Sequence, residues 1–263
     1  MKFVTDISFK NKKALIRVDF NVPLDNHKKV VDSARILAAK PTIDYIINDG
    51  GACVLMSHLG RPKGRNQNLS LKHILKQIQQ CLSREVAFIN DCVGPEVEKA
   101  VNSIKPGEVL MLENLRFYDE EIKGEEEFSE KLSKAGDVYV NDAFGTTHRA
   151  HASTSTVPKF FIEKCAGLLL KKEIESIDRI LVSKKRPVTA IIGGAKVSSK
   201  ITIIKNMLSV VDNLLIGGGM AYTFIKAQGG GVGNSILEPD RVAGCLELIG
   251  EAERQGTLIL LPK

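Results

Sequence analysis

Short apolar runs alternate along the chain with longer stretches in which apolar residues recur at helical spacing. In the first half of the chain, these runs predict strands at residues 13–19, 52–57, 85–89, 108–113 and 137–141. Short runs separated by amphipathic segments are typical of a parallel sheet covered by helices. We therefore expect an α/β fold.

The segment 70–82 shows the helical part of this pattern clearly. Ser70 is a natural N-cap, because its hydroxyl can accept a hydrogen bond from the first turn. Apolar residues then recur every three or four positions, at Leu71, Ile74, Leu75, Ile78 and Leu82. We expect a helix that lays this face on the sheet.

A second series of apolar runs predicts strands at 188–192, 214–216 and 258–261. Between the two series, residues 164–183 have an apolar face with charged residues opposite, which predicts a connecting helix. We expect domains at 1–163 and 184–263 on either side of it. Three strands make a small sheet beside the usual five or six, so we expect the second domain to be incomplete.

Composition narrows the class of protein. No run approaches the roughly 20 apolar residues of a membrane helix, and the N-terminus lacks the features of a secretory signal, so we expect a soluble cytoplasmic protein. The net charge of +6 would suit a nucleic-acid binder, but 4 Tyr and no Trp give little surface for base stacking. A small polyanionic substrate explains the charge equally well. Scattered cysteines without a Cys-x-x-Cys pair predict free thiols, at Cys53, Cys81, Cys92, Cys165 and Cys245.

Polar residues gather where the predicted strands end, which is where open α/β sheets bind ligands. Asp19 and Asn21 follow the first strand, and two explanations remain open for them, an Asx turn or a ligand contact. Arg35 follows Asp32 by three residues on a predicted helix, and this spacing alone favours a surface ion pair. After the second strand, the sequence Ser-His-Leu-Gly-Arg-Pro at 57–62 places imidazole and guanidinium groups beside a glycine, which suits an anion.

Two further strand ends carry cations. Arg116 lies in the sequence Asn-Leu-Arg-Phe, and the loop 142–153 holds His148, Arg149 and His151 among several hydroxyls. Two histidines without carboxylate or thiolate partners at ligand spacing are weak support for a metal site, so we interpret the loop as anion-binding. The acidic clusters at 119–121 and 125–127 predict a solvated surface.

The second domain has glycine-rich turns after its first two strands. The first turn contains Gly193 and Gly194, followed by Lys196 and Lys200, which we expect on one face of a new helix, as nucleotide phosphates would require. This is neither a Walker A loop nor a G-x-G-x-x-G fingerprint. The second turn, at 217–219, allows a base or phosphate to lie against the backbone.

In order, these segments resemble the phosphoglycerate kinase family. The resemblance covers essentially all 263 residues, and it is carried by the sequences RVDFNVP, SHLGRP, ENLRF, NDAFG, HRAH, GGAKVS and GGGMA. It implies an α/β fold with two Rossmann-like parallel-sheet domains joined by a helix, the second domain being incomplete. Ser199 stands where many relatives have Asp, a change that we expect to be tolerated.

The resemblance also implies residue roles. Contacts to phosphoglycerate are assigned to Asp19, Asn21, Arg35, His58, Leu59, Gly60, Arg61, Arg116 and Arg149. Contacts to the nucleotide are assigned to Gly193, Gly194, Lys196, Lys200, Gly217, Gly218 and Ile236. Arg35 and Lys196 would reach the transferring phosphoryl group, which reverses the surface interpretation of Arg35. Lys200 would contact a nucleotide phosphate, and all three would neutralise charge during catalysis.

The implied activity is reversible in-line phosphoryl transfer between 1,3-bisphosphoglycerate and MgADP, giving 3-phosphoglycerate and MgATP, by a monomer whose domains close about a hinge. The Mg²⁺ would arrive with ADP or ATP, because in the family its protein ligand lies in a segment that follows Lys263. An alternative is a phosphoglycerate-binding module with little or no kinase activity. Nucleic-acid binding through general basicity is a third hypothesis, and it predicts steeply salt-dependent affinity.

Overall fold

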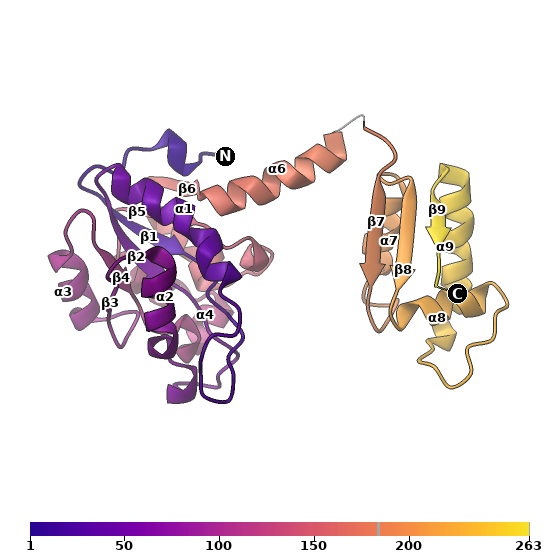
Figure 1. Ribbon diagram of the computed structural model, residues 1–263, viewed down its shortest axis with the longest axis horizontal. Helices are drawn as coiled ribbons and strands as arrows, with labels where there is room; N and C mark the ends of the chain where they lie inside the picture. The colour runs from indigo at the N-terminus through magenta and orange to yellow at the C-terminus, as the bar shows by residue number, and fades with distance from the viewer. Residues whose placement is uncertain (183–184, 263) are drawn as a thin grey trace. The chain divides into compact units, whose positions relative to one another are not determined.

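A computed structural model describes residues 1–182 and 185–262 of the chain (Figure 1). The chain divides into two compact units, which we call unit 1 (residues 1–175) and unit 2 (residues 176–263). The predicted boundaries at 183 and 184 lie outside the described residues. Each unit is described by itself below.

Unit 1 is built on a parallel sheet of six strands in the order β3-β4-β2-β1-β5-β6. Its strands are β1 (Lys13–Arg17), β2 (Ala52–Met56), β3 (Ala87–Phe88), β4 (Val109–Met111), β5 (Val138–Asn141) and β6 (Lys164–Ala166). Each of the predicted runs contains one of the first five strands. The parallel α/β architecture expected from the apolar pattern is therefore confirmed.

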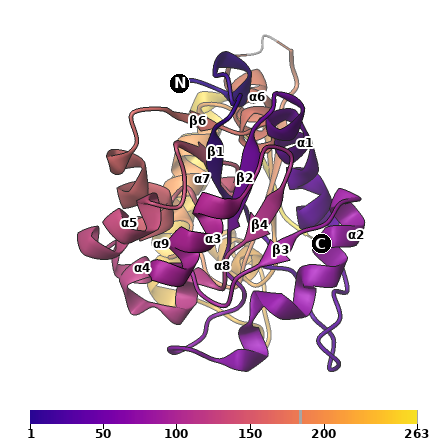
Figure 2. The same ribbon diagram turned by 90° about the vertical axis from the view of Figure 1, so that its left-hand side faces the viewer.

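Helices cover both faces of this sheet (Figure 2). The helices of unit 1 are α1 (Ala34–Asn48), α2 (Leu75–Leu82), α3 (Pro95–Ser103), α4 (Asp119–Lys123), α5 (Glu126–Ser133) and the first half of α6 (Leu168–Val182). Helices α1 and α2 pack on one face, whereas α3 and α5 pack on the other. The predicted helix at 70–82 begins as a 3₁₀ turn capped by Ser70, whose Oγ accepts from the Lys72 amide at 3.2 Å.

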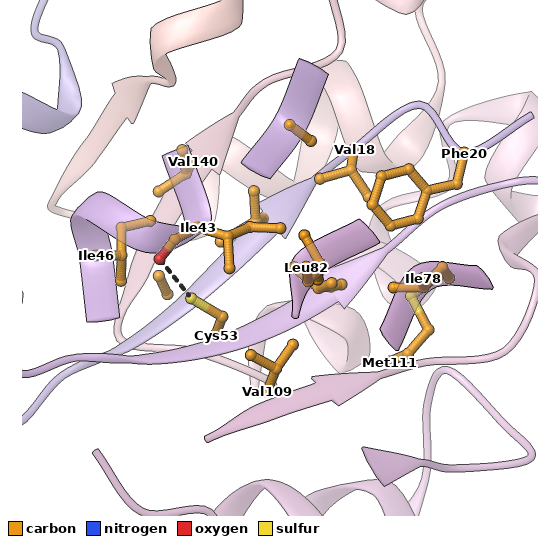
Figure 3. Packing of buried hydrophobic residues seen from close by; sticks show 14 of the residues in the cluster. Val18, Phe20, Ile43, Ile46, Cys53, Ile78, Leu82, Val109, Met111 and Val140 are labelled. Atoms are coloured by element: carbon orange, nitrogen blue, oxygen red, sulfur yellow. Dashed lines mark hydrogen bonds between the residues drawn. The ribbon is translucent and has the colours of Figure 1, made fainter. Parts of the chain in front are cut away.

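The two faces of β1 divide the core between these layers. Ala14 and Ile16 face α1 and α2, while Leu15 faces α3 and α5. Figure 3 shows the first of these clusters, in which Ile43 of α1 and Ile78 of α2 pack over the sheet. Strands buried on both faces read as continuous apolar runs, which is why these strands were visible in the sequence.

The connecting helix begins later than the sequence predicted. Residues Lys164–Ala166 form β6, which pairs with β5, and α6 begins only at Leu168. The prediction of helix from residue 164 is wrong because Cys165 and Ala166 are buried at the sheet edge, where the Ala166 amide donates to Lys2 O at 2.9 Å. Residue 183, its predicted end, lies outside the described part of the chain.

Unit 2 is a three-stranded parallel sheet in the order β7-β8-β9. Its elements are β7 (Thr189–Gly193), α7 (Ile201–Leu208), β8 (Asn213–Gly217), α8 (Met220–Ala227), α9 (Val242–Gln255) and β9 (Leu258–Leu260). One face of the sheet, which includes Ile192 and Leu214, packs against all three helices. On the other face Ile191 aligns with Leu215 and Leu260, and Ile191 is 78% exposed.

The five cysteines are free thiols, and all but the half-buried Cys81 are buried. Burial raises the pKa of Cys92 well above its ordinary value, so this thiol is an unreactive core residue. Within residues 1–182 and 185–262, no helix combines the length and the apolar character that crossing a bilayer would need.

Candidate anion-binding site

The loops after β1 and β2 are bonded to each other at the carboxyl end of the sheet. Asn21 Oδ1 accepts from the Gly60 amide at 2.8 Å, and the Phe20 amide donates to Ser57 Oγ at 2.9 Å. Asn21 N also donates to Asp19 Oδ1 at 3.4 Å, so the Asx turn is present as well. The turn and the cross-link together hold Asp19 and Gly60 at the site.

Arg35 pairs with Asp19 and not with Asp32. Its Nη1 donates to Asp19 Oδ2, whereas Asp32 Oδ1 accepts from the Ala34 amide at 2.8 Å. The surface pair predicted from the spacing is therefore wrong, because Asp32 bonds to the backbone amide two residues ahead of it instead. Arg35 and Asp19 line a pocket of about 400 Å³ whose other walls include Phe144.

Asn114, after β4, fixes the backbone of the loop that carries His58 and Arg61. It is fully buried, its Nδ2 donates to Leu59 O and Leu69 O, both at 2.8 Å, and its Oδ1 accepts from the Leu59 amide at 3.2 Å. The sequence gives a signal for this role, since an amide side chain that follows a buried strand can form hydrogen bonds to buried backbone groups of a neighbouring loop. Asn114 was not among the predicted site residues.

Three guanidinium groups form the cationic part of the site. Arg116 is 4% exposed and donates through Nη1 to Gly60 O at 2.9 Å, whereas Arg61 is exposed and Arg149 is half-buried. Burial lowers the pKa of Arg116, and repulsion from Arg149, Arg17 and Arg61 lowers it further. In the described part of the chain, no carboxylate forms an ion pair with Arg61, Arg116 or Arg149.

His58 lies among these cations and is 4% exposed. Burial lowers the pKa of His58 to about 2, with repulsion from Arg17, Arg116 and Arg149 acting in the same direction. The ring is therefore neutral near pH 7. It can contribute a hydrogen bond to the site but no charge.

Glu121 and Arg17 lie behind these cations and were not predicted from the sequence. The cluster 119–121 was predicted to be solvated, but Glu121 is fully buried because α4 turns it toward Ser153. Burial raises the pKa of Glu121, opposed chiefly by the charge of Arg17 and by hydrogen bonds from Ser153. Arg17 is also fully buried, and no pattern of charge along the sequence distinguishes either residue from a surface residue.

The loop after β5 contributes Arg149 and His151. Arg149 Nε donates to His148 Nε2 at 3.4 Å, and His151 is 9% exposed with its Nδ1 3.8 Å from Glu121 Oε1. Burial and the nearby arginines lower the pKa of His151 to about 4. Over the described ranges, no three His, Cys, Asp or Glu side chains are grouped as a metal site.

The glycine-rich turn after β7 has a shape that differs from the prediction. Lys196 and Lys200 lie before α7, which begins at Ile201, so they do not share a helix face. Glu238, 40 residues further along the chain, holds the turn from outside by accepting from Ser198 Oγ at 2.6 Å, and within the turn Ser199 Oγ donates to Lys196 O at 2.9 Å. Serine hydroxyls often replace helical bonds in this way.

The two glycine-rich strand ends of unit 2 are in direct contact. Gly193 pairs with Gly217, and Gly218 has φ +70°, where a Cβ would lie only 2.8 Å from Gly194 O. A side chain at Gly218 would therefore push the turns apart. Beyond them lies a pocket of about 870 Å³ lined by Gly218, Tyr222 and Leu260, among others. Ile236 is 58% exposed, next to the lining residue Ser235.

Comparison with known proteins gives a consistent result. The sequence model of the phosphoglycerate kinase family matches residues 4–263. A phosphoglycerate kinase of Moorella thermoacetica is 52% identical over 98% of this chain, and one of Aquifex aeolicus is 48% identical over 99%.

Solved structures agree with the sequence relatives. The phosphoglycerate kinase of Coxiella burnetii matches with a TM-score of 0.85 at 34% identity, over 99% of this chain, and that of Pyrococcus horikoshii OT3 matches with 0.84 at 32% identity, over 100%. The chain spans 65% of the Moorella relative and 65% of the Coxiella structure.

Proposed function

The chain belongs to the phosphoglycerate kinase family, and on that premise we propose that it carries the acid-binding site and part of the nucleotide site of a phosphotransferase. The proposed reaction is reversible transfer of a phosphoryl group between 1,3-bisphosphoglycerate and MgADP. The products are 3-phosphoglycerate and MgATP. Mg²⁺ is part of the nucleotide substrate in this proposal.

One observation carries the proposal for unit 1. Arg61, Arg116 and Arg149 come from three different loops, yet the charges of Arg149 and Arg61 lie near enough to Arg116 to add to the effect of burial in lowering its pKa. Like charges brought together without carboxylate partners cost folding free energy. A substrate with a phosphate at one end and a carboxylate or acyl phosphate at the other would neutralise them.

The proposed roles follow from where each group lies. Arg61, Arg116, Arg149 and His58 bind the non-transferring phosphate end, and Leu59 and Gly60, whose backbone is bonded to Asn114 and Asn21, shape the loop beside it. Asp19 and Asn21 hold the loop in place, and Asp19 also orients Arg35. Arg35 stabilises the charge on the transferring group.

In unit 2 we propose that the nucleotide phosphates lie on the contacting glycine turns. Gly193, Gly194, Gly217 and Gly218 leave the backbone uncovered there, and Lys196 and Lys200 supply positive charge. Ile236 supplies an apolar contact to the base, which its exposure permits. These assignments rest on the family relationship and on the open turn.

Catalysis then consists of positioning and charge neutralisation. The attacking oxygen of a carboxylate or of a nucleoside diphosphate is already ionised, so no general base is required. This agrees with a site in which burial, together with neighbouring cations, keeps the pKa values of His58 and His151 low and both rings neutral. Such neutral rings orient the substrate through hydrogen bonds.

A second candidate function is a phosphoglycerate-binding module with little turnover. It is favoured by the location of the cross-linked acid site, whose partners all lie within unit 1. The two candidates differ in turnover and agree on binding.

Isothermal titration of the 263-residue chain with 3-phosphoglycerate tests both candidates. We expect saturable binding that Arg116→Met weakens about 100-fold, because the variant removes a largely buried charge–phosphate contact of roughly 3 kcal/mol. Lys63→Met, which removes an exposed cation from the neighbouring loop, is the matched control and should change affinity less than about threefold. Absence of binding by the unmodified chain would reject both candidates, and a coupled ATP assay separates them.

A further inference from the structure

A buried carboxylate lies behind the cations of the proposed acid site. Both oxygens of Glu121 accept from one residue, Ser153, whose amide donates to Oε2 at 2.8 Å and whose Oγ donates to Oε1 at 2.6 Å. Ser153 belongs to the π-helical turn Ala152–Thr156, directly after the loop that carries Arg149. Glu121 therefore fixes the end of that loop.

The donor and the acceptor are fixed at each link between Ser153 and His58. Arg17 Nε lies 2.9 Å from Ser153 Oγ, and a guanidinium can only donate, so Ser153 Oγ accepts there and its own proton is free to reach Glu121. At its other end, Arg17 Nη2 lies 3.0 Å from His58 Nδ1. By the same reasoning Nδ1 accepts, and the proton of a neutral His58 ring must be on Nε2.

We infer that Glu121 is a positioning residue of the anion site: through Ser153 it orients Arg17, and Arg17 holds His58 in the tautomer that carries its proton on Nε2. His58 Nε2 has no hydrogen-bond partner among the described residues, so its N–H is available to a bound anion. That the anion is phosphoglycerate rests on the proposed function above.

The charge of Glu121 has a second effect. Arg17 is fully buried, and burial lowers its pKa, whereas Glu121 is the foremost of the charges that oppose this shift. An unpaired buried guanidinium is strongly destabilising. Glu121, ahead of Asp19, thus compensates the charge of the cation placed behind His58.

The unmodified chain without ligand provides the first test. Long-range ¹H–¹⁵N NMR distinguishes the two neutral tautomers of a histidine from each other and from the charged ring. His58 signals can be assigned by comparison with His58→Gln, since the chain has only 5 His. We expect the Nε2–H tautomer at pH 7, and an Nδ1–H or doubly protonated ring would overturn the inference.

Substitution provides the second test. In Glu121→Gln one carboxylate oxygen becomes an amide NH₂, which cannot accept from Ser153, so we expect mixed His58 tautomers and about tenfold or greater loss of 3-phosphoglycerate affinity. Ser153→Ala leaves the carboxylate but removes the link and should act in the same direction. Glu120→Gln makes the same chemical change one position away, and should leave both readouts within about twofold of the unmodified chain.

The outcomes separate this inference from the proposed function. A folded Glu121→Gln variant with unchanged tautomer and unchanged affinity would overturn the role of Glu121 while leaving the substrate proposal intact. If the unmodified chain fails to bind 3-phosphoglycerate, the substrate proposal fails, but the comparison of tautomers still decides the role of Glu121. Should Glu121→Gln not fold, Ser153→Ala and the tautomer of the unmodified chain decide it.

Discussion

The two units present their candidate ligand groups in different ways. In unit 1 the strand-end loops are cross-linked by buried side chains, such as Asn114 and Arg17, so that the binding groups are held before a ligand arrives. In unit 2 the turn carrying Lys196 is exposed, and the serine hydrogen bonds that hold it, to Lys196 O and to Glu238, are exposed as well. Rigid elements with a buried supporting layer give more precise sites than open turns do.

The layers beneath the two sites differ in the same sense. The sheet of unit 1 is covered on both faces, whereas that of unit 2 has helices on one face and an apolar row beginning at Ile191 on the other. Parallel sheets are ordinarily buried on both sides. The apolar runs therefore predict strands in both units, but they do not predict whether helices cover both faces of the sheet.

The largest effect on stability should come from adding a side chain at Gly167, in the joint where Asp142, after β5, contacts the start of α6. In Gly167→Ala the new Cβ would lie 2.1 Å from Asp142 Oδ1, which accepts from the Leu169 amide at 3.0 Å. We expect a loss of roughly 4 kcal/mol of unfolding free energy, from overpacking and from disruption of a buried carboxylate. Urea unfolding followed by circular dichroism measures it, and hydrogen exchange should assign the loss to unit 1.

The control for that prediction lies in unit 2. Gly250 is inside α9, where an added Cβ meets only the flexible end of Arg254, at 3.6 Å. Gly250→Ala should therefore stabilise the chain by up to about 1 kcal/mol through helix propensity. Equal losses for the two variants would show that unit 1 is not the more tightly determined part.

A second, smaller effect concerns pH at the same joint. Burial raises the pKa of Asp142 from its ordinary 3.8 to about 6, so the folded state binds a proton that the unfolded state has released. Stability contributed by this group therefore falls as pH rises from about 4 to 6, by roughly 3 kcal/mol. Asp142→Asn should remove this part of the pH dependence, measured as the difference between the two unfolding curves. A constant difference across that range would contradict the prediction.

The smallest effects should come from neighbouring residues on opposite faces of β7. Ile192→Thr buries a hydroxyl in the core of unit 2 and should cost about 2 kcal/mol, since Ile192 is 8% exposed. Ile191→Thr should change stability by less than about 0.5 kcal/mol, because that side chain is already exposed. Thermal unfolding of both variants tests the one-sided packing, and similar losses would mean that the face around Ile191 is covered.

The sequence predicted the fold well because buried parallel strands leave continuous apolar runs. It missed β6, since a three-residue edge strand is too short to be distinguished from the helix that follows it. It also placed Lys196 and Lys200 on a helix, because spacing does not show that Ser198 bonds to the distant Glu238 and Ser199 to Lys196 O, in a turn that precedes the helix start at Ile201.

The site was predictable where a residue's type already indicates its chemistry. Arginines and histidines after buried strands, such as His58 and Arg116, were proposed in this way, and the two lie close enough for the charge of Arg116 to lower the pKa of the buried His58. Their supporting layer was not found, because Glu121 stands in an acidic run and Arg17 inside a strand. Both become distinctive only when residues far apart in the sequence are folded together.

The joint at Asp142 also has a mechanical meaning. Helix α6 has 15 residues, which makes it a rod of about 22 Å, and Asp142 grips its first turn through the Leu169 and Leu170 amides. The carboxylate therefore sets the direction in which the helix leaves the sheet. A tilt of about ten degrees at that point would carry the other end of the rod through roughly 4 Å, so a change too small to notice beside β5 becomes a displacement of atomic-contact size at Val182.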